Sequence, residues 1–232
     1  MNCVFERFEQ KYQIPADLFE SVKKELENFV KRDEYGETTV CSLYYDTKDY
    51  RLIRTSIEKP KYKEKLRLRC YGFGKDKKVF LELKKKAYGV VYKRRIVLKC
   101  EQAFAFFEKG EPLPDSQIAR EITYFRKYYG ALSPAFLVMY DRTAYVGQGD
   151  LRITLDKNTR YREERLNFWS GGDGEALLEN GDVLMEIKTS NGYPFWLVDI
   201  LNKYALYPYS FSKVGTAYLK KIDEKNKMRK AG

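Results

Sequence analysis

Alternating cationic side chains are the feature of this 232-residue sequence that most directly indicates chemistry. Between residues 63 and 69, a Lys or Arg occupies every second position, and leucine occupies two of the positions between them. Because side chains two residues apart on a β-strand share a face, these cations gather on one side of the strand. Guanidinium groups bind phosphate oxygens through paired hydrogen bonds. Arg67, Arg69, Arg142 and Arg152 therefore suit a polyphosphate chain as ligand.

The same segregation of charged from apolar residues recurs in seven of the eight strands that we predict. The charged positions are Arg7, Glu9, Lys11, Lys63, Lys65, Arg67, Arg69, Glu82, Lys84, Lys86, Lys93, Arg95, Arg142, Arg152, Asp156, Glu186 and Lys188. Most are cations, whereas a face that only contacts water would mix the two signs more evenly. An ordinary sheet with one face in the core and the other in solvent also explains the alternation and stays an alternative.

Three glutamates, Glu9, Glu82 and Glu186, interrupt the cationic positions. Their carboxylates would repel a phosphate chain unless a divalent cation lay between them. Mg²⁺ and Mn²⁺ prefer oxygen ligands and bridge carboxylate to phosphate. Many cations with a few glutamates are therefore the expected lining of a site for a metal-bound triphosphate, with Mn²⁺ or Mg²⁺ as cofactor.

Histidine is absent from the sequence, which carries a formal net charge of +11. Its absence excludes histidine acid–base catalysis, Ser–His and Cys–His nucleophiles, and histidine-ligated zinc. The four cysteines have no metal or redox spacing and are expected to be reduced. No apolar run is long enough to cross a bilayer, and the charged N-terminal segment is unlike a signal peptide, so we predict a cytoplasmic protein without a membrane segment.

Alternation with Gly-rich breaks predicts antiparallel strands joined by short turns. The predicted strands are approximately Phe5–Ile14, Thr38–Asp46, Tyr62–Tyr71, Lys78–Lys86, Val91–Lys99, Phe136–Val146, Asp150–Lys157 and Asp182–Thr189. Helical spacing predicts helices over Leu18–Val30, Gln117–Tyr129, Pro194–Tyr204 and Lys213–Ile222. We expect one domain over residues 1–222 and a basic, disordered tail over 223–232. If the sheet closes on itself with the helices outside, the charged faces point inward.

Several short motifs occur in a specific order along the chain. They are Arg7-x-Glu9-x-Lys11-Tyr12, Ser42-Leu43-Tyr44-Tyr45-Asp46, Arg67-Leu68-Arg69-x-Tyr71-Gly72, Phe80-Leu81-Glu82-Leu83-Lys84, Tyr140-x-Arg142, Arg152-Ile153-Thr154-Leu155-Asp156, Glu186-Ile187-Lys188 and Phe211-Ser212-Lys213. Together, over about residues 4–221, they resemble the VTC domain, the polyphosphate polymerase branch of the triphosphate tunnel metalloenzymes (CYTH-like superfamily). The resemblance implies an α+β fold, an eight-stranded antiparallel closed β-barrel with helices packed outside.

The resemblance also implies roles for individual residues. The residues expected to carry catalysis are Lys11, Arg67, Arg69, Arg142, Arg152 and Glu186. Further phosphate contacts are expected from Lys84, Lys93, Arg95, Lys188, Ser212 and Lys213, and the metal is expected at Glu186, Glu9 and Glu82. Position 7 departs from the wider superfamily, whose first strand has Glu where this chain has Arg7. That change shifts the strand from metal binding toward phosphate binding.

The expected activity is transfer of the γ-phosphate of ATP, or another nucleoside triphosphate, to a growing inorganic polyphosphate chain. The attacking phosphate oxygen is already anionic, so this reaction needs no general base. A triphosphatase or polyphosphatase, in which Glu9 or Glu82 activates water, is the first alternative, and a non-catalytic polyphosphate-binding module is the second. Nucleic acid is not an expected partner, because most aromatic residues fall in apolar stripes; partner proteins are not indicated. Lys63 and Lys65 are interpreted as strand-end surface charges rather than phosphate ligands.

Overall fold

The computed structural model describes residues 8–88 and 90–231, so Arg7 lies outside the described residues. The chain divides into two compact units. The first unit contains the described residues up to Thr39, together with Tyr140–Thr159 and Leu178–Phe211. The second contains Val40–Met139, Arg160–Leu177 and the chain from Ser212 onward. The single domain predicted from the sequence stays a prediction.

An antiparallel sheet of nine strands runs through the fold. The strands are β1 (Phe8–Ile14), β2 (Lys31–Asp46), β3 (Tyr62–Tyr71), β4 (Lys78–Ala87), β5 (Val90–Lys99), β6 (Ser133–Val146), β7 (Arg152–Arg162), β8 (Glu175–Ala176) and β9 (Val183–Thr189). Their order is β1-β9-β7-β6-β2-β3-β4-β5, and the short β8 pairs with β7 outside this path. Each of the eight predicted strands overlaps one of these; only β8 has no predicted counterpart.

The sheet is open, which corrects one expectation. In the described residues β1 and β5 end the order, and no pairing joins them. The α+β class and the helices outside the sheet are as expected, but the closed eight-stranded β-barrel is wrong. Alternation specifies which face of each strand is buried. It does not specify whether the first and last strands of a sheet meet, and this is why the sequence could not settle closure.

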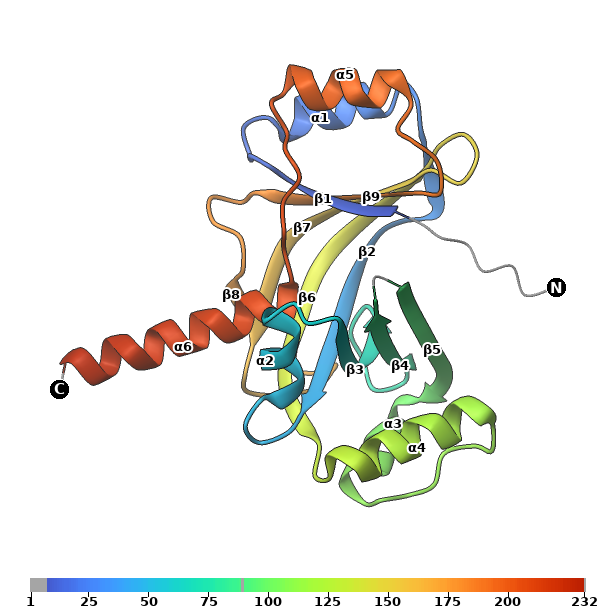
Figure 1. The fold of residues 1–232 in the computed structure, drawn as a ribbon, viewed down its shortest axis with the longest axis vertical. Helices are drawn as coiled ribbons and strands as arrows, with labels where there is room; N and C mark the ends of the chain where they lie inside the picture. Colours follow the sequence, from blue (N-terminus) through green and yellow to red (C-terminus); the bar gives the residue numbers. More distant parts are fainter. Residues whose placement is uncertain (1–7, 89, 232) are drawn as a thin grey trace. The chain divides into compact units, whose positions relative to one another are not determined.

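In the first unit, two helices cover one face of β1, β7 and β9. They are α1 (Phe19–Leu26) and α5 (Phe195–Lys203), which lie over β1 and β9 in Figure 1. Their apolar sides form a core with the strand residues that alternate with the charged ones. Val22, Leu26 and Leu197 are fully buried there. The opposite face of these strands is left to the charged side chains.

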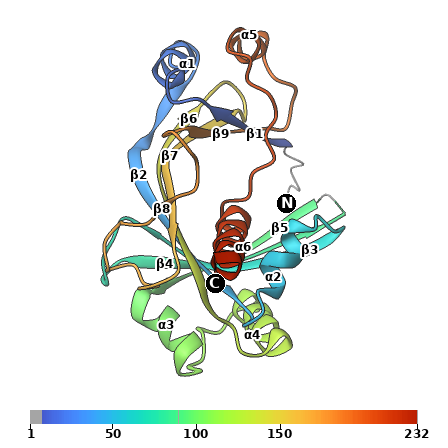
Figure 2. The ribbon, with the colours of Figure 1, turned by 90° about the vertical axis from the view of Figure 1, so that its left-hand side faces the viewer.

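In the second unit, helices α3 (Cys100–Glu108) and α4 (Gln117–Tyr129) cover the apolar face of β3, β4 and β5 (Figure 2). Leu66, Leu68, Leu81 and Leu83 are fully buried beneath them. Helix α2 (Arg51–Ile57) contacts β3 and the last helix, α6 (Lys213–Ala231). None of the helices in the described part of the chain is long and apolar enough to cross a membrane.

Two helices, α2 and α3, have no counterpart among the predicted ones. Every residue of α3 from Ala103 to Phe107 is buried, so this segment lacks the polar stripe that marks an amphipathic helix. Helix α4, which has such a stripe, has the bounds expected from the sequence. Helix α6 continues to Ala231, beyond the expected end at Ile222.

Candidate functional site

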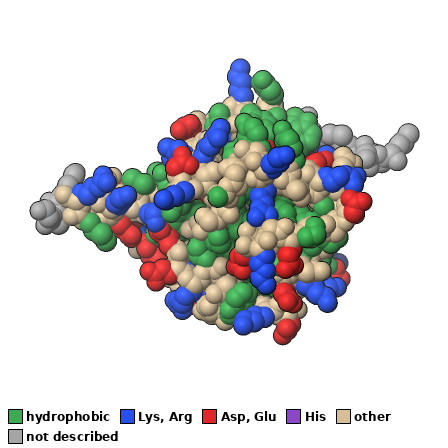
Figure 3. Space-filling model, turned by 90° about the horizontal axis from the view of Figure 1, so that it is seen from below, with side chains coloured by type: hydrophobic (Ala, Val, Ile, Leu, Met, Phe, Trp, Pro, Cys, Tyr) green, Lys and Arg blue, Asp and Glu red, His purple; other side chains and the backbone are tan. Residues whose placement is uncertain are grey.

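A group of cations, which we call the basic cluster, lies on the face of β3, β4 and β5 opposite the helices. Its members are Lys65, Arg67, Arg69, Lys84, Lys93 and Arg95, with Glu82 among them. Six cations thus surround one carboxylate. Basic and acidic side chains are instead interspersed on the outer face seen in Figure 3, as on an ordinary solvated surface. The excess of cations distinguishes the cluster from such a surface.

Glu82 is the centre of the basic cluster. Strand register places Arg67 and Arg95 directly opposite it, one on each neighbouring strand. Arg67 donates to Glu82 Oε2 from Nε at 2.8 Å, while Arg95 Nε at 2.7 Å and Lys93 Nζ at 2.9 Å reach Oε1. The carboxylate is 1% exposed, and burial alone would raise its pKa. The charges of Arg67, Arg69 and Lys93 outweigh that effect and hold the pKa of Glu82 far below its usual range.

The contacts of Glu82 suit a counterion for the surrounding cations better than a metal ligand. Both of its oxygens already accept hydrogen bonds from three cations, Arg67, Lys93 and Arg95. A metal ion at Glu82 would have to displace these donors and stand among like charges. The geometry of Glu82 is therefore that of a counterion, and its assignment as a metal ligand stays a prediction that these contacts do not favour.

Two residues that sequence reasoning did not assign to the site, Tyr44 and Lys65, also belong to this face. The Tyr44 hydroxyl accepts a hydrogen bond from Arg67 Nη1 at 3.1 Å. Burial raises the pKa of Tyr44, but Arg67, Lys65 and Arg69 outweigh it and lower the pKa to about 8. Lys65 is half-buried and donates to Ser212 Oγ at 3.0 Å, so it is not a strand-end surface charge. The sequence signal for Lys65 was the face that it shares with Arg67 on one strand, whereas Tyr44 occurs in the motif over residues 42–46 without an assigned role.

Ser212 connects α6 to the basic cluster. Its hydroxyl accepts from the backbone N–H of Gly215 at 3.3 Å, and its carbonyl accepts from Thr216 N at 2.8 Å, so Ser212 caps the first turn of α6. Lys213 is the first residue of that helix. The structure thus brings Ser212 to the basic cluster through Lys65, and its expected role beside phosphate ligands stays a prediction.

A second charged group, which we call the carboxylate pair, lies in the first unit on β1 and β9. It consists of Glu9 and Glu186 with two lysines between them, Lys11 and Lys188. Lys11 lies directly opposite Glu186, and Lys188 lies directly opposite Glu9. Lys188 Nζ is 2.6 Å from Glu186 and 3.6 Å from Glu9, while Lys11 Nζ is 3.0 Å from Glu9 and 3.9 Å from Glu186. Each lysine is thus shared by both carboxylates.

Glu186 is the buried member of the carboxylate pair. Burial raises its pKa, but Lys188, Arg142 and Lys11 outweigh burial and Glu9, so the pKa stays below its ordinary value. The carboxylate is therefore ionised at neutral pH. On the neighbouring strand, directly opposite Glu186, Thr154 has a buried hydroxyl oxygen that makes no hydrogen bond within the described residues. An ionised carboxylate beside an unsatisfied hydroxyl is a set of oxygen donors that suits Mg²⁺ or Mn²⁺.

Arg142 lies near the carboxylate pair and is held by a buried partner. Its Nε and Nη2 donate to the two oxygens of Asp156 at 2.6 and 2.8 Å. Asp156 is fully buried. Burial lowers the pKa of Arg142, but Tyr140, Asp156 and Glu186 outweigh burial and raise the pKa well above the ordinary value. Arg152 lies directly opposite Lys188 and is exposed. Asp156 orients Arg142, a role that sequence spacing alone did not indicate.

The predicted site residues therefore fall into two groups, one in each unit. The basic cluster contains the predicted residues Arg67, Arg69, Glu82, Lys84, Lys93 and Arg95, with Ser212 and Lys213 at the start of α6. The carboxylate pair and its neighbours contain Glu9, Lys11, Arg142, Arg152, Glu186 and Lys188. Within the described residues, no three or more of Asp, Glu and Cys gather to hold a metal ion. A metal at Glu9 and Glu186 would therefore need further ligands from its substrate or from water.

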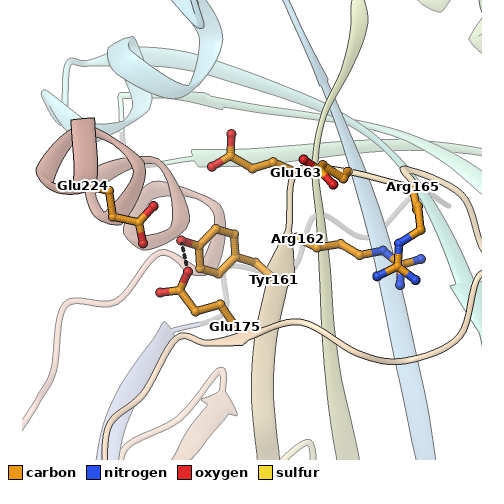
Figure 4. Close-up of a pocket in the computed structure, with 7 residues that line it drawn as sticks. Tyr161, Arg162, Glu163, Arg165, Glu175 and Glu224 are labelled. Carbon is orange, nitrogen blue, oxygen red and sulfur yellow. Dashed lines mark hydrogen bonds between the residues drawn. The ribbon is translucent and has the colours of Figure 1, made fainter. Parts of the chain in front are cut away.

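A pocket of about 270 Å³ lies elsewhere in the second unit, beside β7, β8 and α6 (Figure 4). Its lining is Tyr161, Arg162, Glu163, Glu164, Arg165, Glu175 and Glu224. Tyr161 donates to Glu175 Oε2 at 2.9 Å across it. Four carboxylates against two arginines do not favour a phosphate ligand, and the pocket contains no residue of the basic cluster.

The profile of the VTC domain matches residues 6–221. No curated protein matches the chain. Among solved structures, an adenylyl cyclase candidate from Hippeastrum, described as having a dominant triphosphatase activity, has a TM-score of 0.59 at 17% identity, covering 90% of this chain and 93% of that one.

A second adenylate cyclase candidate, from Bacillus halodurans, has a TM-score of 0.55 at 14% identity and covers 88% of this chain and 92% of its own. At these identities the likeness concerns the fold alone. The profile match extends over nearly the whole sequence and includes both charged groups. The chain therefore belongs to the VTC domain family.

Proposed function

We propose that this protein is a metal-dependent polyphosphate polymerase that transfers the γ-phosphate of ATP, or of another nucleoside triphosphate, to a polyphosphate chain. Membership in the VTC domain family supports a function connected with polyphosphate or triphosphate. The observation that carries the proposal is the basic cluster, in which six cations share one sheet face with a single carboxylate. A cation excess of this size needs an anionic ligand of high charge density, and a phosphate chain is such a ligand.

The proposed reaction needs no covalent bond between the protein and the substrate. A terminal oxygen of the acceptor chain attacks the γ-phosphorus, a new P–O bond forms, and the bond to the β-phosphate oxygen breaks, releasing the nucleoside diphosphate. Because the attacking oxygen is already anionic, no general base is required, in keeping with a sequence that lacks histidine. Arg67, Arg69 and Arg95 would neutralise the equatorial oxygens while the charge shifts toward the leaving group.

Family membership also implies a divalent cation, and the carboxylate pair suits one. Glu9 and Glu186 would hold it, and the two lysines that now share their oxygens would be free to contact phosphate instead. When bound, the cation supplies charge neutralisation to the triphosphate. Arg142, fixed by Asp156, would orient phosphate oxygens next to the pair.

Triphosphate hydrolysis is the second candidate, because a structural neighbour from Hippeastrum is described as having a dominant triphosphatase activity. A hydrolase must activate water, usually through a carboxylate. Glu82 does not suit that role, since its oxygens accept from Arg67, Lys93 and Arg95 and its pKa is held far below neutral pH. Glu9 would have to act as the base. The polymerase requires no such group and is therefore the preferred function.

Incubation with ATP and Mn²⁺ followed by a urea gel separates the two functions. A ladder of long phosphate chains supports the polymerase, and free phosphate alone supports the hydrolase. Unchanged ATP, with tripolyphosphate still bound, indicates a binding module and contradicts both enzymes. Glu186→Gln should abolish turnover while the protein stays folded, whereas the matched surface change Glu20→Gln should leave turnover intact.

The basic cluster is tested by a second pair of variants. Arg67→Ala should weaken binding of tripolyphosphate, because it removes a cation from the centre of the cluster. Arg120→Ala removes an exposed arginine of the same unit and should leave binding unchanged. Normal turnover in both Glu186→Gln and Arg67→Ala would refute the assignment of the site.

A further inference from the structure

Lys65 stands at one end of a row of three lysines in the basic cluster. Strand register places Lys65 opposite Lys84, and Lys84 opposite Lys93. Like charges directly opposite one another destabilise a sheet. The neighbouring row contains Glu82 between two arginines, and Glu82 also pairs with Lys93 at the far end of the lysine row, at 2.9 Å. A phosphate chain lying against the row would relieve the repulsion between its lysines.

The amine of Lys65 is held toward that row from outside the sheet. Its Nζ donates to the hydroxyl of Ser212, the residue that caps α6. Within the described residues, the acceptor of this hydrogen bond is a neutral hydroxyl and not a carboxylate. A neutral hydroxyl fixes the direction of the amine without neutralising its charge. Lys65 is thus positioned for an anion, and within residues 8–88 and 90–231 it has no carboxylate partner of its own.

The surroundings of Lys65 are mostly cationic. Burial is the largest influence and lowers the pKa of Lys65, and Lys84, Lys63 and Arg67 lower it further against the opposing effect of Tyr44, to about 8. The groups that face it are Tyr44 from β2, Lys63 and Arg67 from β3, Lys84 from β4 and Ser212 from the start of α6. Near pH 8, the unliganded protein therefore contains Lys65 partly as a neutral amine.

We propose that Lys65 is a phosphate-binding residue of the basic cluster, aimed by Ser212, and that it takes up a proton when a phosphate chain binds. The inference rests on the proposed function, because it names a further ligand for the same substrate. The proton passes from solvent or buffer to the neutral amine, and no other bond is made or broken. The ammonium group then donates to a phosphate oxygen as a charge-assisted hydrogen bond.

Calorimetric titration with tripolyphosphate tests the proposal without any turnover. The full chain is titrated at about pH 8, without metal, in two buffers that differ in their heats of ionisation. The difference in binding heat gives the number of protons exchanged. A lysine whose pKa is near the working pH is about half protonated, so wild type should take up about half a proton more than Lys65→Met. Protons exchanged by tripolyphosphate itself are common to both proteins and cancel.

Two substitutions separate binding from structure. Lys65→Met should weaken tripolyphosphate binding by about 10- to 100-fold at neutral pH, the loss expected for one hydrogen bond to a charged group. Lys65→Arg should restore most of the affinity, because the guanidinium is always charged, but it should not restore the proton uptake. Lys127→Met removes an exposed lysine of the same unit and should change neither quantity.

Tyr44→Phe identifies the source of the proton uptake. The variant cannot titrate at position 44, so an uptake that persists in it belongs to Lys65. The proposal is overturned if Lys65→Met binds tripolyphosphate like wild type, or if its proton uptake equals that of wild type. These outcomes differ from failure of the proposed function. In that case wild type itself would not bind tripolyphosphate or would leave ATP unchanged.

Discussion

Replacing Glu82 by Gln removes the one negative charge of the basic cluster while keeping the size of the side chain. The carboxylate is 1% exposed and accepts hydrogen bonds from Arg67, Lys93 and Arg95. Breaking a buried ion pair by removing one partner costs about 3–5 kcal/mol. The three cations retain 19%, 44% and 34% of their side-chain exposure, respectively, so water screens part of the loss. We therefore expect a destabilisation of about 2–3 kcal/mol.

Thermal unfolding measures this loss. For a chain of this size, about 1 kcal/mol shifts Tm by roughly 2–4 °C, so Glu82→Gln should lower Tm by about 4–12 °C at neutral pH. The pKa of Glu82 is lowered in the folded state, so its contribution is present above the pKa of the unfolded chain, about 4.3, and is lost as pH falls further. The difference between wild type and variant should therefore shrink in acid.

Tripolyphosphate distinguishes a counterion from an ordinary buried carboxylate. It should raise the Tm of Glu82→Gln more than that of wild type, because the bound anion replaces the missing charge; about 100 times Kd supplies roughly 2.7 kcal/mol. Glu64→Gln is the matched control. Glu64 is also buried, but it accepts from Tyr62 and Tyr129 at 2.7 Å on the opposite face of β3. Equal gains in the two variants, or a Glu82→Gln variant as stable as wild type, would refute this reasoning.

Two further predictions concern the neighbours of the site. Asp156→Asn should destabilise the protein by about 3 kcal/mol in chemical denaturation, because it breaks an ion pair in which Asp156 is fully buried and the Arg142 side chain is 21% exposed; the exposed Asp115→Asn should have no measurable effect, and equal effects would contradict the argument. In a spectroscopic pH titration, the tyrosinate absorbance of wild type should include a step near pH 8 that Tyr44→Phe lacks. Bound tripolyphosphate should move that step to higher pH, because a second anion disfavours the ionised phenol; a step that stays in place would exclude phosphate from the vicinity of Tyr44.

Periodicity predicted most of the local elements of the fold, but not α2, α3 or β8. Strand β3 and helix α4 have the bounds expected from alternation and from helical spacing. Helix α3 was missed because burial on nearly all sides removes the amphipathic signal. Closure of the sheet was predicted wrongly, because it depends on a meeting of edge strands that no pattern within a single strand encodes.

For the candidate site, the sequence predicted the strand faces of the charged residues but not their contacts. Alternation correctly placed Arg67, Arg69 and Glu82 on one face, opposite the leucines. It did not show that Glu82 would be saturated by cations, since that depends on the register between strands. The link from Lys65 to Ser212 joins residues 147 positions apart, and only tertiary packing brings them together. The sequence thus shows which side chains share a face of one strand. The residues that those side chains contact on other elements are known only from the structure.

Among the strands that the structure describes, β5 ends the sheet with no strand paired to its outer edge, and Lys93, Arg94 and Arg95 place positive charge on both of its sides. Natural sheets use such lysine-rich edges to prevent self-association, because two copies repel each other before their backbones can pair. The same charges that would attract a phosphate chain would thus also oppose pairing of two copies along this edge. A long polyanion bound along this edge would screen the repulsion between two copies. Binding of the ligand would therefore make self-association through β5 easier.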